Sequence, residues 1–579
     1  MTAGRAVLYF TELNFNEMKV IVYATNFLIL FLFTQNILHS NPIITDVKYS
    51  EIETFSVKVT WRTNEPADSK VRWMISDSNY QVIEYTDSLY NPVLDTVHSV
   101  VISYLNPYTI YNYNISSTSF SGSTKTQNLM FATQSVNDGR ISVFFNKSID
   151  TTVSSGIIAE GNADLRAKLL NRIVSSGYFI DAVTSHFEDA AEITSELIRA
   201  HQNGVIIRFI YDGKQNSRWI DTLLANGIKV VKRNYDNNNG HCLNANFWVF
   251  DARSTCSGSN VFVWTSSSQI SDIGFYEDKN SAVEINDRTL AYIYTREVDE
   301  MWGSHSNNPD TSLVKFGSRK ADNVPHLVNL NGVYAEVYFG PSDSINSQIK
   351  KFFNRSSSTI AFGTYDFNSQ DIYNSLYQLR LTKNIRGIFD KSKLNVSYFN
   401  LMRTWADVWN DSTSGRLFHK YIISDPTGNY NTSSVLMGSS DWTDESNLYN
   451  DENIIILHSP IIANQYYQEF HQRYKEVSGH PVSINTFSNE IPSNFKLYQN
   501  YPNPFNAQTV IRFSVKRQAV VNIQVYNVLG QKVTDLVNTR FNPGEYQVTF
   551  NSSSLSSGIY YYTMRSEDFS EVKKLVITK

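Results

Sequence analysis

Two stretches of the chain repeat one order of predicted elements, and this repeat limits the possible folds more than any other feature. In residues 140–304, helical apolar spacing over 165–175 is followed by a buried strand at 179–183. A second predicted helix, 191–203, precedes the near-continuous apolar strand 205–212, a pattern typical of parallel sheets. This alternation of helices and strands predicts α/β layers.

Residues 328–478 repeat the same order, and two pairs of aspartates mark corresponding points. Asp212 and Asp390 each close an apolar strand and lie 178 residues apart. Asp251 and Asp425 lie 174 residues apart at the ends of two further strands. Two landmarks at nearly one offset predict a duplicated domain, fused into one α/β unit, with Asp251 and Asp425 near its approximate twofold axis.

The second half contains a recognisable motif. A predicted strand runs from Phe418 to Asp425, a Gly438-Ser439 turn follows, and Asn453 lies further on. This order resembles the second motif of the phospholipase D superfamily, which reads His-x-Lys-x4-Asp, then Gly-Ser, then a downstream Asn. Lys420 and Asp425 have the required spacing, whereas Phe418 stands where the histidine belongs.

The first half contains a more altered copy of that motif. Asp251 fixes its register, so Asn244 stands at the histidine position and Asn246 at the lysine position. A Thr-Ser-Ser stretch containing Ser266 replaces the Gly-Ser turn, and Asn280 fits the downstream Asn. Both nucleophile positions are therefore substituted, although the surrounding sequence still resembles the family.

The resemblance implies a specific chemistry. One histidine attacks phosphorus, the other protonates the leaving alcohol, the lysines stabilise the phosphoryl oxygens and the aspartates orient the histidines. It implies a phospholipid or nucleic-acid phosphodiester as the ligand, and no metal or organic cofactor. The implied catalytic positions are Asn244, Asn246, Asp251, Phe418, Lys420 and Asp425, and the implied substrate-binding positions are Ser266, Asn280, Ser439 and Asn453.

The substitutions favour a degenerate site, that is, a pseudoenzyme that keeps at most a weak phosphate contact through Lys420. Asn cannot form a phosphoryl-enzyme, and Phe neither donates nor accepts a proton. Side chains alternate along a strand, so His419 is expected to point away from the face that carries Lys420. A β-bulge that re-aims His419, or His241 in the first half, would instead give an active phosphodiesterase. A third interpretation is a cell-surface binding or adhesive protein.

The regions on either side of the duplicated unit read as β-structure. Val57, Val59 and Trp61 alternate with polar residues as in a half-buried strand. The Leu105–Tyr113 stretch resembles a fibronectin type III strand with its tyrosine corner. At the other end, short strands with turn signals follow the Tyr501–Asn506 turn at the spacing of a sandwich.

The C-terminal stretch closely resembles the sorting domain of the type IX secretion system. The resemblance rests on the Pro-Asn-Pro-Phe turn within Tyr501–Asn506, the Gly558–Tyr561 strand and the lysines between Lys573 and Lys579. It implies the type IX machinery as a partner, and a secreted or cell-surface location. We expect the sorting domain to be removed from the mature protein.

The N-terminal residues resemble a secretory signal peptide. A short basic start at Met18-Lys19 precedes the apolar run Val20–Phe33, and cleavage is expected near Ser40. An uncleaved membrane anchor is the alternative, although the run is shorter than the roughly 20 residues that span a bilayer. Met18 is an alternative start of the protein.

These observations predict a multidomain protein with an N-terminal β-sandwich, a central duplicated α/β phospholipase D-like unit and a C-terminal β-sandwich sorting domain. A formal net charge of −5 excludes a broad basic surface for nucleic acid. Two cysteines, Cys242 and Cys256, exclude a disulfide scaffold and leave open one bridge or two free thiols. The predicted boundaries are 1–40 signal peptide, 41–135 fibronectin-like module, 140–304 first half, 305–327 connector, 328–478 second half, 479–496 linker and 497–579 sorting domain.

Overall fold

The structure is a computed structural model of the chain. It describes residues 41–76, 84–214, 217–234, 241–254, 256, 258, 260–427, 431–478, 484–488, 492–506, 508–541, 543–552 and 555–578. The predicted signal peptide, residues 1–40, lies outside the described residues. No helix among those described is long and apolar enough to cross a membrane.

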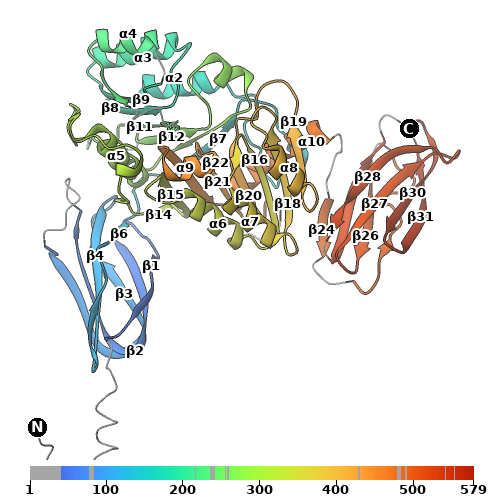
Figure 1. Ribbon diagram of the computed structural model, residues 1–579, viewed down its shortest axis with the longest axis horizontal. Coiled ribbons are helices and arrows are strands. Elements are labelled where there is room, and N and C mark those ends of the chain that lie inside the picture. The colour runs from blue at the N-terminus through green and yellow to red at the C-terminus, as the bar shows by residue number, and fades with distance from the viewer. Residues whose placement is uncertain are drawn as a thin grey trace, which may run out of the picture.

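The N-terminal domain is a twisted antiparallel assembly of β-strands, drawn in blue in Figure 1. Its interior is filled by Trp61, Tyr113 and Phe131, each nearly inaccessible to solvent. The hydroxyl of Tyr111 accepts a hydrogen bond from the backbone N–H of Asn106 at 2.8 Å, which closes the turn before that strand. The strands are β1 (Ile44–Ser50), β2 (Ser56–Ile75), β3 (Asp87–Ser103), β4 (Ile110–Ser119), β5 (Gly122–Lys125) and β6 (Leu129–Ala132).

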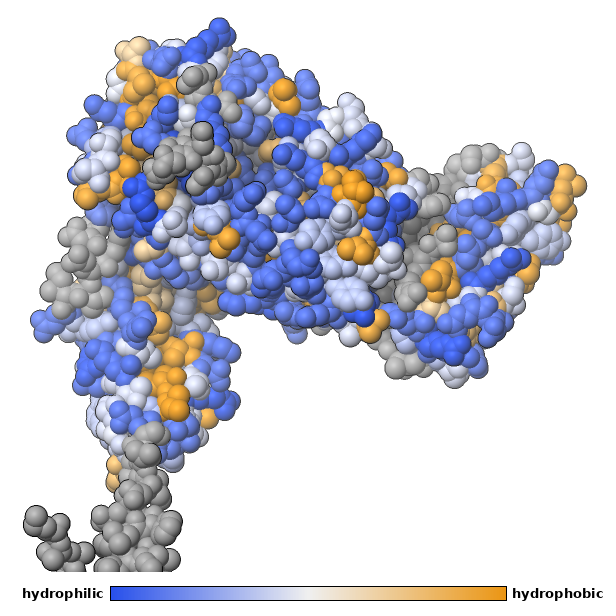
Figure 2. All heavy atoms as spheres, in the orientation of Figure 1, coloured by the Kyte–Doolittle hydropathy of each residue, from blue (hydrophilic) through white to orange (hydrophobic). Residues whose placement is uncertain are grey.

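Strand β3 pairs only with β2 among the described strands and exposes much of its apolar sequence. The exposed fractions of Val93, Val97 and Val101 are 63%, 54% and 52%. Figure 2 shows apolar side chains gathered on this domain, in contrast to the mostly hydrophilic surface of the central unit. Strand β3 thus leaves apolar surface exposed on the N-terminal domain.

The first half of the central unit is a mixed sheet in the order β10-β9-β8-β11-β12-β13-β7. Helices α2, α3 and α4 pack on its outer face, and α5 packs on the face shared with the second half. The strands are β7 (Ile141–Phe145), β8 (Phe179–Thr184), β9 (Ile206–Asp212), β10 (Lys229–Arg233), β11 (Phe247–Phe250), β12 (Phe262–Ser266) and β13 (Ser281–Ile285). The helices are α2 (Leu165–Ser175), α3 (Ala191–Gln202), α4 (Arg218–Ala225) and α5 (Arg288–Trp302).

The second half is a larger sheet in the order β14-β15-β23-β21-β20-β16-β18-β19. Its last helix, α10, packs against both halves and so completes one continuous core between the two sheets. The strands are β14 (Leu327–Leu330), β15 (Val333–Gly340), β16 (Thr359–Thr364), β18 (Asn384–Asp390), β19 (Asp407–Asp411), β20 (Lys420–Ser424), β21 (Ser434–Gly438) and β23 (Glu452–His458). The helices are α6 (Ile345–Arg355), α7 (Gln370–Leu379), α8 (Val396–Met402), α9 (Asp444–Leu448) and α10 (Pro460–Ser478), with a small sheet of β17 (Phe367–Asn368) and β22 (Trp442–Thr443) beside them.

The predicted duplication is present, and corresponding contacts repeat in the two halves. The carboxylate of Asp212 accepts the backbone N–H of Leu243 at 2.7 Å, and that of Asp390 accepts the backbone N–H of Leu417 at 2.6 Å. Leu243 forms a β-bridge with a residue of the second half, and Leu417 forms one with Lys279 of the first. The reciprocal bridges show that the halves meet across an approximate twofold axis.

A buried ion-pair network fixes the first half internally. The guanidinium of Arg208 on β9 makes a bidentate contact with Asp181 on β8 at 2.7 Å and reaches Asp299 on α5 at 2.6 Å. The side chain of Arg208 is fully inaccessible to solvent. Arg253 also contacts Asp181, and His305 contacts Asp299, so each carboxylate has a second partner besides Arg208.

The C-terminal domain is built from two four-stranded sheets around its own core. The stretch 479–496, predicted to be a linker, includes one strand, because 484–488 pairs with β29. Alternation of apolar and polar residues there is too short to stand out in the sequence. The strands are β24 (Ile484–Ser488), β25 (Lys496–Leu497), β26 (Gln508–Val515), β27 (Ala519–Tyr526), β28 (Lys532–Phe541), β29 (Gly544–Asn551), β30 (Gly558–Ser566) and β31 (Phe569–Ile577). Cys242 and Cys256, in the central unit, are both free thiols.

Candidate functional site

The two altered motifs meet at the contact between the halves. Asn244 precedes β11 and Phe418 precedes β20, so each lies where its strand leaves that contact. The side-chain amide of Asn244 donates toward the carbonyl oxygen of Ser439 at 3.1 Å, Asp441 at 3.3 Å and Glu452 at 3.0 Å. All three acceptors belong to the second half, so this one amide connects the two halves at the site.

Asn246, at the first lysine position, is buried and its hydrogen-bonding groups are occupied. Its Oδ1 accepts from the backbone N–H of Ser185 at 3.0 Å and from the hydroxyls of Ser185 and Thr184 at 3.2 Å. Its Nδ2 donates to the carbonyl of Asn244 at 3.0 Å. A neutral amide thus replaces the charge that the family places here, and it is held by the protein itself.

Phe418, at the second histidine position, is buried under aromatic and cationic side chains. Its ring centroid lies 4.4 Å from that of Tyr365. The guanidinium of Arg416 lies 4.8 Å from the same ring, and the ammonium of Lys420 lies 3.8 Å from it. The ring therefore fills this position with a group that performs no proton transfer.

Lys420 is the one motif lysine that remains, and its side chain is buried. Its ammonium lies 3.7 Å from the carboxylate of Asp441, besides its contact with the ring of Phe418. An anionic ligand at Lys420 would therefore compete with a carboxylate that the protein already supplies.

Three carboxyl groups at the site were not predicted from the sequence. Burial, and after it the charge of Asp441, raises the pKa of Glu452 to about 8. Burial also raises the pKa of Asp441, although the charge of Lys420 opposes the change. The pKa of Asp366 is raised to about 6 by burial and then by Asp441. Glu452 therefore carries a proton at neutral pH, chiefly because it is buried and also because Asp441 lies nearby.

We expect Glu452→Gln to stabilise the protein above pH 8. The pKa of Glu452 is higher in the folded than in the unfolded state. The stability that Glu452 contributes is therefore fully present below about pH 4.5 and is lost as the pH rises toward 8. Thermal midpoints measured from pH 5 to pH 9 should fall more steeply for the wild type than for the variant. Glu192→Gln, an exposed change on α3, should follow the wild-type curve, and an equally steep fall in Glu452→Gln would contradict the assignment.

The strand register corrects which residues correspond across the axis. Ser266 on β12 pairs with Ala282, as Gly438 on β21 pairs with Ile454. Asn280 lies two residues before Ala282, and Glu452 lies two residues before Ile454. The two residues therefore hold equivalent positions in the two halves. Asn280 therefore corresponds to Glu452, not to Asn453 as the sequence predicted.

The same register moves the serine correspondence. The hydroxyl of Ser439 donates to Glu452 at 2.8 Å, and the hydroxyl of Ser267 donates to Asn280 at 2.8 Å. Ser267 rather than Ser266 is thus the counterpart of Ser439. Asn453, predicted as a substrate contact, is buried and donates to the hydroxyl of Thr265 at 2.9 Å.

The motif aspartates Asp251 and Asp425 lie away from the axis, which corrects the expected orienting role. Asp251 follows Asn244 by seven residues, roughly 20 Å along an extended strand. Its carboxylate accepts the backbone N–H groups of residues 177–179 at 2.8–3.0 Å. Asp425 accepts those of residues 357–359 at 2.7–2.9 Å. Asp251 therefore stabilises the turn before β8, and Asp425 stabilises the turn before β16.

We expect Asp425→Asn to remove a pH-dependent part of the stability. Burial would raise the pKa of Asp425, but hydrogen bonds from Ser357, Thr432 and Thr359 outweigh it and lower the pKa to about 2. Because the pKa of Asp425 is lower in the folded state, its carboxylate stabilises the protein above about pH 4, and this stability is lost as the pH falls toward 2. Thermal midpoints between pH 5 and pH 2 should fall less in the variant than in the wild type. Asp371→Asn, an exposed partner of Lys350, is the control that should not change the slope.

The two histidines considered as substitute nucleophiles point elsewhere. Nε2 of His419 lies 2.9 Å from the carboxylate of Glu469 on α10, and both side chains are almost inaccessible to solvent. The ring of His241 stacks on Tyr449 with centroids 4.2 Å apart. The alternative in which a β-bulge re-aims His419 toward the site is not seen, because β20 has no register shift and strand alternation turns the His419 side chain into the core, as expected.

His186 is a half-buried imidazole at the site that sequence reasoning did not identify. It follows β8, and its Nδ1 lies 3.1 Å from the side-chain amide of Gln269. Burial lowers the pKa of His186, with the charges of Glu188 and Asp212 opposing the change. It was missed because it lies outside the motif spacing, and only the folding of β8 beside β11 brings it to the site.

Comparison with known families matches two parts of the chain. A family described as "Cardiolipin synthase, PLD-like domain" matches residues 169–302 and 349–474. A family described as "Secretion system C-terminal sorting domain" matches residues 499–578. Among curated proteins, the mitochondrial cardiolipin hydrolase of Xenopus tropicalis is 35% identical over 80 residues, which cover 14% of this chain and 34% of that protein. The chain thus spans about a third of the length of that relative.

Comparison with solved structures matches, among others, phosphatidylserine synthase of Haemophilus influenzae Rd KW20. It is 12% identical with a TM-score of 0.41, and the match covers 54% of this chain and 84% of that one. The phospholipase D family member Nuc of Salmonella typhimurium is 17% identical with a TM-score of 0.23, covering 25% and 96% respectively.

Proposed function

We propose that this chain, in which residues 169–302 and 349–474 match a PLD-like domain and residues 499–578 match a secretion-system sorting domain, is a secreted or cell-surface phospholipase D-like protein without phosphohistidine chemistry. The resemblance assigns phosphodiester hydrolysis, on phospholipid or nucleic acid, to the superfamily. In this chain the altered groups at the site point to a pseudoenzyme.

One observation carries the proposal: neither motif position offers a nucleophile. The amide of Asn244 faces Ser439, Asp441 and Glu452, and Phe418 packs on an aromatic ring. Nucleophilic catalysis needs a group that attacks phosphorus and a base or lowered pKa that activates it. Neither an amide nor a phenyl ring supplies those properties.

The charges at the site support the same conclusion. A single lysine contact with phosphate is worth about 1.5–3 kcal/mol. At Lys420 that gain is opposed by the carboxylate of Asp441, 3.7 Å away. Phosphate binding by Lys420, Ser439 and Asn453 is therefore expected to be weaker than millimolar, since the last two are engaged with Glu452 and Thr265.

The experiment is phosphodiester turnover by the purified full chain, beside the Asn244→His, Asn246→Lys, Phe418→His revertant. Absence of wild-type turnover together with activity in the revertant supports the proposal. Wild-type turnover well above background would overturn it.

His186 carries the second candidate function, an active phosphodiesterase with a relocated nucleophile. Its lowered pKa favours the neutral imidazole at pH 7, the form that attacks or accepts a proton. This candidate predicts wild-type turnover that is abolished by His186→Ala and unaffected by His241→Ala. The two variants therefore separate it from the pseudoenzyme proposal.

A further inference from the structure

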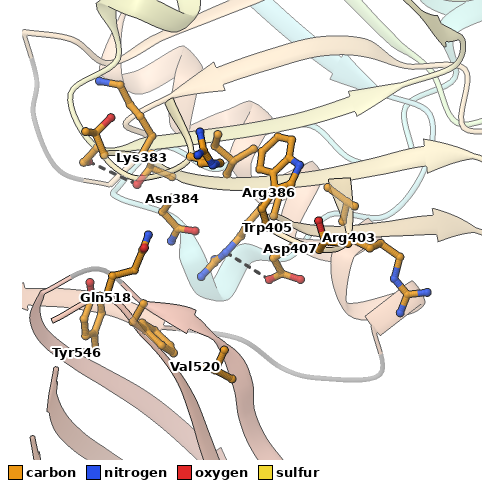
Figure 3. A pocket seen from close by; sticks show the side chains of 18 of the residues that line it. Lys383, Asn384, Arg386, Arg403, Trp405, Asp407, Gln518, Val520 and Tyr546 are labelled. Carbon is orange, nitrogen blue, oxygen red and sulfur yellow. Dashed lines mark hydrogen bonds and ion pairs between the residues drawn. The ribbon is translucent and has the colours of Figure 1, made fainter. Parts of the chain in front are cut away.

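A cavity lies between the second half of the central unit and the sorting domain, well away from the twofold axis. Its volume is about 490 Å³. One wall comes from β18, β19 and the loops that follow α7 and α8, at the outer edge of the sheet. Figure 3 shows Arg386, Trp405 and Asp407 on this wall, with Gln518 and Val520 of the sorting domain facing them.

The cavity wall carries a marked excess of positive charge. Arg380, Lys383, Arg386 and Arg403 line it, against the single carboxylate of Asp407. Of these cations, only Arg386 has a carboxylate within ion-pair distance in the described part of the chain, namely Asp407 at 3.8 Å. The carboxylate of Asp407 in turn accepts from Tyr474 at 2.5 Å and from Trp409 at 2.9 Å.

Two buried donors in the cavity wall have no hydrogen-bond acceptor among the described residues. Arg386 is 5% exposed, and its Nε is one of them. The indole Nε1 of Trp405 is the other. A buried donor without an acceptor costs about 1–3 kcal/mol, and more for a charged group. Neither atom has surface accessible to water, so an oxyanion in the cavity would meet the positive charge of the wall rather than these two donors.

The opposite wall neither neutralises the cations nor competes with an anion. The sorting domain contributes Gln518, Val520, Phe541, Pro543 and Tyr546, none of which carries charge at neutral pH. We propose that this cavity binds a phosphate group, either inorganic phosphate or the phosphate of a small organic monoester. A phosphate monoester carries nearly two negative charges at pH 7 and so matches the wall better than a carboxylate does.

The two sources of phosphate are separable by the probe. Inorganic phosphate has only the oxyanion, whereas phenyl phosphate adds a ring that can lie against Trp405 or Trp409 in the same cavity. Equal affinity for the two probes would assign the site to phosphate itself. Tighter binding of phenyl phosphate would assign it to an organic ester.

The test is calorimetric titration, with each probe, of the full chain before removal of the sorting domain, since that domain forms one wall of the cavity. Arg403→Gln and Lys383→Gln should each weaken binding roughly tenfold or more, because each removes one charge-assisted contact. Arg403 is exposed, so its variant is expected to fold. Arg218→Gln is the matched control, since Arg218 is also exposed and lies 4.4 Å from the ring of Trp219 outside the cavity.

The proposal is independent of the twofold-axis site, and one further variant separates them. Lys420→Ala should leave both affinities unchanged if phosphate binds in the cavity. Binding that is lost in Lys420→Ala and retained in Arg403→Gln and Lys383→Gln would overturn the proposal. Failure of the wild type to bind either probe would overturn it as well.

Discussion

Purified full-length protein is expected to hydrolyse a chromogenic phosphodiester no faster than buffer alone. Loss of a catalytic nucleophile typically costs several powers of ten, on the order of 10⁴–10⁶ in turnover. Here the amide of Asn244 and the ring of Phe418 occupy both nucleophile positions, and Asn246 replaces one of the two lysines. Initial rates should be measured across pH 5–9, so that a shifted optimum is not mistaken for inactivity.

The Asn244→His, Asn246→Lys, Phe418→His revertant is expected to exceed the wild type by roughly a hundredfold, still far short of a complete site. An imidazole at position 244 would find the carboxyl of Glu452, now 3.0 Å from the Asn244 amide. An imidazole at 418 would find no such partner, because Asn280 stands where the other half has Glu452. Adding Asn280→Glu should raise turnover further. A revertant no better than wild type would show that substitutions elsewhere in the site prevent catalysis.

Replacing Arg208 by alanine is expected to destabilise the central unit by about 3 kcal/mol, near the lower end of the range for breaking a buried ion pair. The change leaves the carboxylates of Asp181 and Asp299 without the guanidinium that contacts both. Arg253 and His305 still contact them, which is why we expect the lower end of that range.

The measurement is denaturant unfolding followed through the tryptophans of the central unit, one of which, Trp302, lies beside Arg208. Because a multidomain chain need not unfold in one step, the shift should appear in the transition of this unit alone. Arg199→Ala, which removes a largely exposed pair with Glu196, is the control and should cost about 0.5 kcal/mol or less. Similar effects for the two variants would contradict the network's role.

The duplication could be predicted because its landmarks follow from local pattern. Asp212 and Asp390 end apolar strands, and in the structure both accept a backbone N–H just before the motif strand. The expected direction of His419 also followed from local pattern, since strand alternation alone turned it toward the core. Features that depend on a single strand and on the alternation of its side chains can thus be predicted from the sequence.

Residues that reach the site through packing between strands were not predictable. Glu452 adjoins Asn453, and only the pairing of β21 with β23 shows which of the two faces the axis. His186 and Asp366 follow β8 and β16, and no spacing rule connects them to the motifs. Strand β24 was missed because its partner, β29, lies some sixty residues away in the sequence.

The positions of Asp251 and Asp425 bear on how such sequences are recognised. Both residues adopt positive φ, at 56° and 46°, and both bind three successive backbone amides of a distant turn. These contacts stabilise the two turns whether or not any phosphorus chemistry takes place. A search that gives weight to the final aspartate of the motif will therefore recover inactive members as readily as active ones. A match at that position indicates that a turn is stabilised, whereas only the histidine and lysine positions indicate catalysis.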